Sequence, residues 1–135
     1  GSRKMIIVLD ASAGIEVALS REGAEIYERK IEEASKVITS ELYKAETANV
    51  LWKYAMAGLL SKEEVQKRLK YCDELIDEYI DISENNEEAL NEGIRIKHSV
   101  YDLLYLVIAR RNGAILLTQD KKLKTIAKEI GVEIE

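Results

Sequence analysis

The chain has 135 residues, which is enough for one domain with a hydrophobic core of its own, so folding requires neither a disulfide nor a structural metal. A hydrophobic content of 47% with 33% charged residues is typical of a soluble globular protein and excludes a disordered chain. A single cysteine, Cys72, excludes the disulfide-rich secreted class and cysteine-based zinc sites, and no apolar run approaches the roughly 20 residues of a membrane span. The net charge of −5, taken alone, argues against a nucleic-acid partner.

Short apolar runs rich in branched residues alternate along the chain with longer segments of helical composition. Strands are expected at 5–9, 37–39, 79–82, 114–118 and 132–134. Helices are expected at 11–19, 22–34, 40–57, 61–79, 86–96, 100–109 and 121–130. This alternation predicts an α/β fold, a three-layer α/β/α sandwich around a mostly parallel sheet of four to five strands.

The chain is expected to form one domain. No internal repeat or low-complexity linker divides residues 5–135. Residues 1–4 are expected to be an N-terminal tail, in which Gly1-Ser2 has the look of a cloning remnant. Within the domain, Ser61-Lys-Glu-Glu64 has the pattern of a capping box and predicts a helix start at that point.

The negative charge is unevenly distributed. Residues 71–94 hold nine acidic residues and no basic one, whereas residues 95–128 hold eight basic and two acidic residues. The second segment is therefore positive by six charges (eight minus two), which is compatible with binding nucleic acid. Its basic residues, of which we single out Arg110, Lys121 and Lys122, are candidates for phosphate contacts; the alternative is that they serve solubility and pair with the acids at 73–92.

Three aspartates stand alone beside strongly apolar sequence, although the chain uses 19 Glu and only six Asp. Asp10 directly follows the first predicted strand, and Asp120 follows the fourth by two residues. Ligands of parallel α/β sheets bind outside the carboxyl ends of the strands, so both are expected at one edge. Asp102 lies in the first turn of the helix at 100–109, and Glu46 interrupts the apolar helix at 40–57.

Each of these acids also has a purely structural interpretation. Asp10 and Asp120 precede helices and could be N-caps, Ser99-x-x-Asp102 matches a capping box, and Glu46 could be an ordinary acid of a helix surface. The set carries more information than any member, because capping alone does not explain why isolated aspartates gather at one end of one sheet.

Carboxylates brought together repel one another, and their pKa values rise unless a cation neutralises them. Oxygen-only ligands favour Mg²⁺ or Mn²⁺, and such an ion can lower the pKa of a bound water and stabilise the leaving oxygen of a phosphodiester. The chain has one histidine and one cysteine, so no cluster of these residues supports zinc. Hydrolysis assisted by a hard divalent ion is the chemistry that fits.

Four segments, in their order and spacing, resemble the PIN-domain ribonucleases, and specifically the VapC toxin group of toxin–antitoxin pairs. The segments are Ile7-Val-Leu-Asp-Ala-Ser12, Glu46-Thr-Ala-Asn-Val-Leu51, Val100-Tyr-Asp-Leu-Leu-Tyr-Leu-Val-Ile-Ala109 and Leu116-Leu-Thr-Gln-Asp-Lys-Lys-Leu123. The resemblance extends over almost the whole chain, from Met5 to Glu135.

The resemblance implies a function and a site. The acidic residues of the metal site would be Asp10, Glu46, Asp102 and Asp120. Ser12 and Thr118 would hydrogen-bond these acids or the ion's water, and Asn49 would be a partner of Glu46. Glu41 is a rival to Glu46 but does not precede the Ala-Asn-Val-Leu pattern. The family implies Mg²⁺- or Mn²⁺-dependent endonucleolytic cleavage of RNA, a homodimer, a small VapB-like antitoxin as partner, a cytoplasmic location and no membrane contact.

Other functions remain as alternatives. The chain could be a PIN nuclease of RNA processing that is not a toxin, or a catalytically degenerate module that binds RNA or protein. A signalling receiver domain would need an acidic pair after the first strand and a phosphate-accepting aspartate after the third. Asp10 is single, and Asp81 is a poor acceptor, so the receiver class is disfavoured.

Several further residues are expected to be structural. His98, the only histidine, is interpreted as incidental. Tyr101 and Tyr105 share a helix face and are assigned to the core, although Tyr101 could stack on a base. Core packing is likewise expected of four residues late in the helix at 40–57 and just beyond it, with an apolar groove for an antitoxin helix as the alternative. These residues are Trp52, Ala55, Met56 and Leu59.

Overall fold

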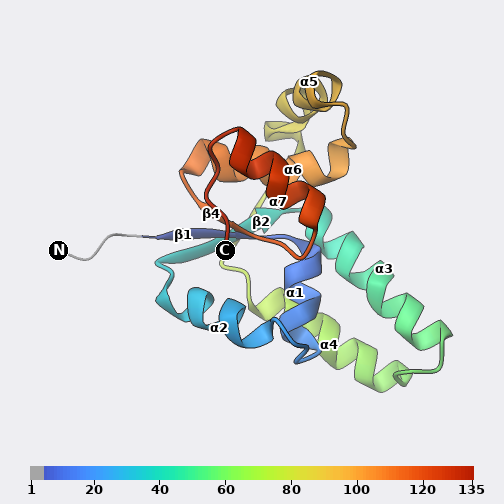
Figure 1. The fold of residues 1–135 in the computed structure, drawn as a ribbon. Helices are drawn as coiled ribbons and strands as arrows, with labels where there is room; N and C mark the ends of the chain where they lie inside the picture. The colour runs from blue at the N-terminus through green and yellow to red at the C-terminus, as the bar shows by residue number, and fades with distance from the viewer. Residues whose placement is uncertain (1–4) are drawn as a thin grey trace.

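The computed structural model describes residues 5–135, and the tail expected at 1–4 lies outside them (Figure 1). Its sheet contains β1 (Ile6–Leu9), β2 (Lys36–Ser40), β3 (Glu78–Ile80) and β4 (Ile115–Leu117). The strands lie in the order β3-β2-β1-β4 and every neighbouring pair is parallel, so the expected α/β class is confirmed.

Seven α-helices surround the sheet within the described residues. They are α1 (Ala11–Ala18), α2 (Ala24–Glu33), α3 (Leu42–Met56), α4 (Lys62–Glu74), α5 (Asn86–Ile96), α6 (Val100–Asn112) and α7 (Lys121–Glu129), with a 3₁₀ turn η1 (Ile82–Glu84) before α5. Figure 1 shows α6 and α7 above the sheet and α1 and α2 below it, which gives the three layers. No helix in the described part of the chain is long and apolar enough to cross a membrane.

Two expected elements differ from the structure. The helix expected to reach residue 79 ends at Glu74, because Asp77 bonds to β2: its backbone N–H donates to the carbonyl of Val37 and its carboxylate accepts from the N–H of Val37, both at 2.8 Å. The strand expected at 132–134 is reduced to a single bridge between Leu116 and Ile134, since β4 is only three residues long. The capping box at Ser61 is formed as predicted.

The core lies between the sheet and its two helical layers. Ile7, Val8 and Leu9 of β1 are fully buried, and the apolar run at 103–109 makes α6 a helix covered on nearly all sides. Burial of both sheet faces explains why the strands are continuously apolar rather than alternating. The left-handed backbone at Gly113 (φ 58°) ends α6 and returns the chain into β4.

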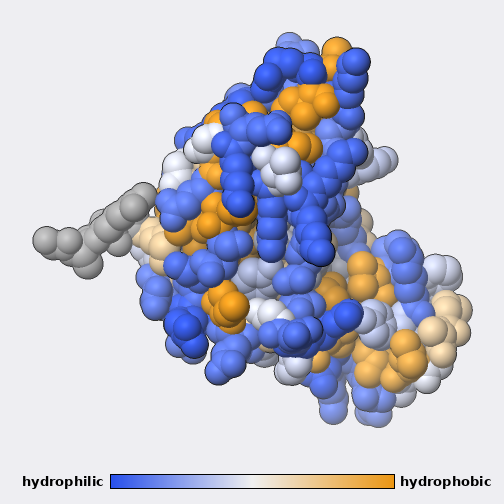
Figure 2. Space-filling view, in the orientation of Figure 1, coloured by the Kyte–Doolittle hydropathy of each residue, from blue (hydrophilic) through white to orange (hydrophobic). Residues whose placement is uncertain are grey.

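The outer end of α3 leaves the core. Trp52, Met56 and Leu59 are 57%, 67% and 68% exposed, so their expected place in the core is wrong. The α3–α4 hairpin extends beyond the sheet, and its tip has no layer of the domain to pack against (Figure 1). Apolar side chains are visible at that tip in Figure 2.

The order of the strands fixes where a ligand can bind. The chain passes from β1 outward through β2 to β3 and then returns across β1 to form β4 on the other side. Connections therefore leave β1 and β4 in opposite directions, which opens a crevice at their carboxyl ends. Asp10 and Asp120 follow these two strands.

A glycine allows α1 to pack against α3. Gly14 faces the fully buried Tyr43, and a Cβ at Gly14 would lie 2.4 Å from the Tyr43 hydroxyl. That hydroxyl donates to the backbone carbonyl of Cys72 on α4 at 2.7 Å. Contact between α1, α3 and α4 thus depends on the missing side chain at residue 14.

We expect Gly14→Ala to destabilise the fold by about 1–3 kcal/mol, because the overpacking cost exceeds the helix propensity gained from alanine. Chemical denaturation measures the free energy of unfolding. In a Tyr43→Leu background the same change should cost much less, since the clashing ring is gone; equal costs in both backgrounds would contradict this account of the packing.

Candidate metal centre

A pocket of about 370 Å³ lies at the carboxyl ends of β1 and β4. All four predicted acids line it: Asp10, Glu46, Asp102 and Asp120. They come from the end of β1, from α3, from the first turn of α6 and from the residue before α7. Glu41, the rival of Glu46, does not line this pocket; its carboxylate pairs with Lys44 at 3.2 Å.

Asp10 is the most buried of the four acids, at 5% exposure. Its Oδ1 accepts from the Ala13 N–H at 2.9 Å and from the Ser12 hydroxyl at 2.7 Å, so it caps α1 and lines the pocket at once. Burial raises the pKa of Asp10 to about 6, against the effect of hydrogen bonds from Thr118, Ser12 and Ala13, and the negative charge of Asp102 raises it further.

Ser12 and Thr118 tie the two strand ends together. The Ser12 hydroxyl accepts from the backbone N–H of Gln119 at 2.9 Å and lies 3.4 Å from the Thr118 hydroxyl. The Thr118 hydroxyl accepts from the N–H of Asp120 at 3.1 Å. These bonds hold the loop after β4 against the start of α1, and with it the relative position of Asp10 and Asp120.

Asp120 has the same double role as Asp10. Its Oδ1 accepts from the Leu123 N–H at 3.0 Å, which caps α7. Its other carboxylate oxygen accepts no hydrogen bond within residues 5–135. The two interpretations open from the sequence, cap and pocket acid, therefore hold together for Asp10 and for Asp120.

Asp102 is hydrogen-bonded by His98, which the sequence analysis interpreted as incidental. No side-chain cap is formed at Ser99, so the alternative interpretation of Asp102 as part of a capping box is not supported. The Asp102 Oδ2 instead lies 2.9 Å from Nε2 of His98, whose side chain is 9% exposed. The only sequence signal for this contact was the i, i+4 spacing of His98 and Asp102. That signal is weak, because the sequence did not predict the turn at Lys97 that positions His98.

Glu46 has a tyrosine partner. The hydroxyl of the buried Tyr105 donates to Oε1 of Glu46 at 2.6 Å. Burial raises the pKa of Glu46, the bond from Tyr105 opposes this, and the charge of Asp102 adds to it. Asn49 lines the pocket but gives no hydrogen bond to Glu46, so its expected partnership is not formed. Tyr101, expected beside Tyr105 in the core, is 63% exposed.

The donor set fits a hard divalent cation. The pocket offers carboxylate oxygens from four residues, and burial raises the pKa values of Asp10 and Glu46, with the charge of Asp102 adding to both. Within residues 5–135, no three acidic, histidine or cysteine side chains are already arranged around one ion position. Binding of a divalent cation would therefore require the carboxylate side chains to adjust, and water would complete the coordination.

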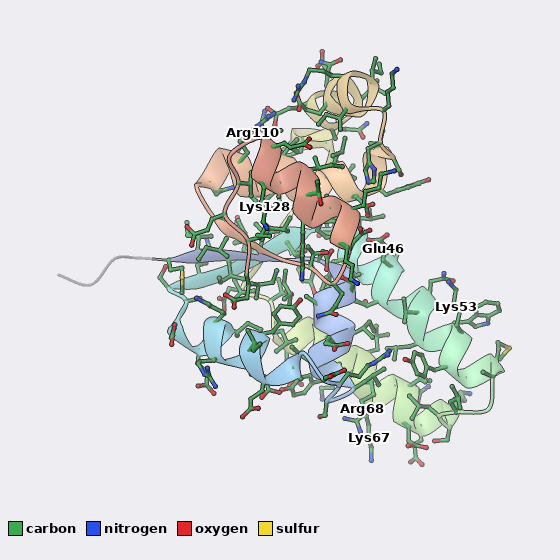
Figure 3. All side chains as sticks on the ribbon, viewed as in Figure 1. Glu46, Lys53, Lys67, Arg68, Arg110 and Lys128 are labelled. Carbon is green, nitrogen blue, oxygen red and sulfur yellow. The ribbon has the colours of Figure 1, made fainter. Side chains whose placement is uncertain are left out.

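The predicted basic residues divide into two groups (Figure 3). Lys121 and Lys122 are exposed and directly follow Asp120. Arg110 lies well away from Glu46 near the far end of α6, where its guanidinium is 3.5 Å from Glu92 and 3.6 Å from Glu88. For Arg110 the structure favours pairing with the acidic tract over a place at the pocket.

One cation at the pocket was not singled out as a phosphate contact. Lys53 lines the cavity from α3, two turns after Glu46, and makes no ion pair within the described residues. Figure 3 shows Lys53 on the outer part of α3. The sequence signal was its i+7 spacing from Glu46 on the same helix face.

Comparison with known proteins gives one consistent result. The PIN domain model matches residues 7–129. Ribonuclease VapC3 from Pyrobaculum aerophilum is 34% identical over 125 residues, which cover 88% of this chain and 92% of that protein.

Two solved structures share the fold. PAE2754 from Pyrobaculum aerophilum superposes with a TM-score of 0.72 at 23% identity, over 97% of this chain and 98% of that one. VapBC2 from Rickettsia felis, solved bound to a DNA fragment from their promoter, gives 0.69 at 19% identity over the same shares of the two chains. The resemblance inferred from the four motifs is thus confirmed: the chain belongs to the PIN domain family.

Proposed function

We propose that this protein is a metal-dependent endoribonuclease, the VapC-type toxin of a toxin–antitoxin pair. The observation that carries the proposal is the convergence of Asp10, Glu46, Asp102 and Asp120 on one pocket at the switch in strand order. The similarity to Ribonuclease VapC3 over nearly the whole of both chains supports RNA as the substrate.

The four acids would hold Mg²⁺ or Mn²⁺. When bound, the ion would act as a Lewis acid on the phosphodiester and activate the attacking water. The chain's own contribution is orientation. Ser12 and Ala13 fix Asp10, His98 fixes Asp102, and Tyr105 fixes Glu46, so three carboxylates enter the pocket with one oxygen already bonded.

Basic side chains at the mouth would bind the RNA backbone. Lys53 lines the pocket, and Lys121 and Lys122 stand exposed beside Asp120. Contacts of lysine to phosphate add affinity without reading the base sequence. They also offset the repulsion that four carboxylates would otherwise exert on a polyanionic substrate.

A small VapB-like antitoxin is the proposed partner, together with a homodimer and a cytoplasmic location. The VapBC2 structure, a chain of which shares this fold, supports the antitoxin. The exposed apolar residues of the hairpin tip, Trp52, Met56 and Leu59, are the kind of surface that a partner helix covers. A PIN nuclease of RNA processing is the alternative, while the presence of all four acids disfavours a degenerate binding module.

We expect the purified protein to cut structured RNA in the presence of Mn²⁺ and to stop in EDTA. Asp102→Asn and Glu46→Gln should each lower the cleavage rate by about 100-fold or more, because each removes a negatively charged oxygen ligand. Rates are measured from labelled RNA on denaturing gels.

Glu41→Gln provides the matched control, since Glu41 lies five residues before Glu46 and pairs with Lys44 outside the pocket. Its rate should equal that of the unaltered protein. Cleavage that persists in EDTA or in Asp102→Asn would indicate a contaminating nuclease and overturn the proposal.

Metal affinity should depend on pH through Asp10. The pKa of its carboxyl is about 6 in the folded protein, so protons compete with the cation as the pH falls through that value. We expect Mn²⁺ affinity, measured by calorimetry, to be constant above about pH 7 and to fall roughly tenfold per unit below pH 6.

The stability of the metal-free protein should depend on pH in the opposite direction. Because the pKa of Asp10 is raised in the folded state, its protonation stabilises the fold. This contribution to the free energy of unfolding is fully present below the unfolded value of 3.8 and is lost as the pH rises through about 6. The metal-free protein should therefore gain stability from pH 7 to pH 5, and Asp10→Asn should remove most of that gain. Mn²⁺ affinity unchanged down to pH 5 would contradict the role given to Asp10.

Lys53→Ala should weaken RNA binding with little loss of kcat, because Lys53 lines the pocket and would contact the RNA phosphates without holding the ion. We expect KM to rise about three- to tenfold and the salt dependence of binding to fall by about one charge. Lys67→Ala, an exposed lysine on α4 away from the pocket, is the control (Figure 3). Equal effects of the two changes would show that only overall charge matters.

A further inference from the structure

A tight turn between α5 and α6 places His98 beside Asp102, which lines the pocket. Lys97 adopts the left-handed conformation (φ 62°), and the backbone N–H groups of Lys97 and His98 both donate to the carbonyl of Gly93. Gly93 is buried, and a Cβ there would lie 2.9 Å from the His98 carbonyl oxygen. The glycine thus permits the close approach that sets the position of residue 98.

Among residues 5–135, the imidazole of His98 is the sole donor to the Asp102 carboxylate. Asp10 and Asp120 are bonded by backbone N–H groups of the helices that they cap, and Glu46 is bonded by the Tyr105 hydroxyl. Asp102 is in the first turn of α6 but caps nothing, and its Oδ2 accepts only from His98 within residues 5–135. Without His98, its carboxylate would have no hydrogen bond to fix its rotamer.

The chemistry of the pair suits a ligand to a cation. A carboxylate can only accept, so the hydrogen shared at 2.9 Å belongs to Nε2 of His98. Histidine is a side chain that can donate this bond in an uncharged form, without cancelling the negative charge that a cation requires, whereas an arginine or lysine would compete with the cation. Oδ1 of Asp102, the oxygen away from His98, accepts no hydrogen bond from the described residues.

We propose that His98 is a positioning residue for the metal centre, which fixes Asp102 through Oδ2 and reserves Oδ1 for the cation. The inference rests on the proposed function, because it takes Asp102 to be a ligand. Hydrogen-bond partners of ligands that act in this way typically change metal affinity or activity by about 10- to 100-fold when removed.

The test compares Mn²⁺ affinity by calorimetry in the unaltered protein and three variants. His98→Leu removes the donor, and we expect affinity to fall about 10- to 100-fold. His98→Gln places an amide N–H₂ at about the reach of Nε2 and should restore most of the affinity. Ser99→Ala alters the same turn at a residue whose side chain makes no capping hydrogen bond, and should bind Mn²⁺ as the unaltered protein does.

A purely structural role is separated by stability and by a double variant. Unfolding of the metal-free protein in EDTA should differ between His98→Leu and His98→Gln by much less than their Mn²⁺ affinities do. In an Asp102→Asn background, His98→Leu should have no further effect on Mn²⁺ affinity. If His98→Leu does not fold, His98→Asn, whose shorter amide falls short of Asp102, takes its place in the comparison.

The outcomes distinguish the two levels of inference. If the unaltered protein binds Mn²⁺ and cuts RNA while His98→Leu binds Mn²⁺ equally well, the role of His98 is overturned and the proposed function stands. If affinity drops but His98→Gln does not restore it, the donor role is likewise overturned. If the unaltered protein binds no Mn²⁺ and cuts no RNA, both proposals fail.

Discussion

The constraint on which the site depends is the burial of a negative charge at the end of β1, beside the end of β4. The Asp10 carboxylate is almost fully enclosed, and its raised pKa shows that the folded protein holds the charged form at a cost. The surrounding bonds reduce this cost: Ser12, Ala13 and Thr118 all hydrogen-bond Asp10. A divalent cation would remove most of what is left, so the same desolvation that opposes folding favours metal binding.

In this fold the same two aspartates, Asp10 and Asp120, cap a helix and line the pocket. A residue that caps a helix directly after a parallel strand has its backbone fixed by the sheet on one side and by the helix on the other. One carboxylate oxygen of Asp10 and of Asp120 is used by the helix N-terminus, which leaves the residue lining the pocket with little rotamer freedom. Asp102 and Glu46 lie inside helices, where no cap is available, and aromatic side chains supply the donor instead.

The sequence predicted what local pattern and strand polarity determine, and missed what tertiary contacts determine. The buried strand before Asp10 and the parallel sheet followed from apolar runs. The position of the isolated aspartates pointed to one end of the sheet, and the resemblance to PIN-domain ribonucleases added Glu46 to the set. The end of α4 was wrong because Asp77 pairs with β2, forty residues away in the chain. Tyr105 replaced Asn49 at Glu46 because the crossing of α3 and α6, and not spacing within α3, brings the partner. The role of His98 was missed because its contact with Asp102 requires a left-handed backbone conformation at Lys97. A glycine at that position would have indicated such a turn, but the residue is a lysine.

The packing at Gly14 has a mechanical consequence for the pocket. Tyr43 is one turn before Glu46 on α3, and its hydroxyl is bonded to the backbone of α4 while its ring rests on α1. These contacts of Tyr43 join the base of the α3–α4 hairpin to α1, the helix that Asp10 caps. Glu46 lies one turn further along α3. Glu46 lies on α3 between Tyr43 and the exposed tip, so a partner that displaced the tip would move this helix about its contact at Tyr43 and would carry Glu46 with it.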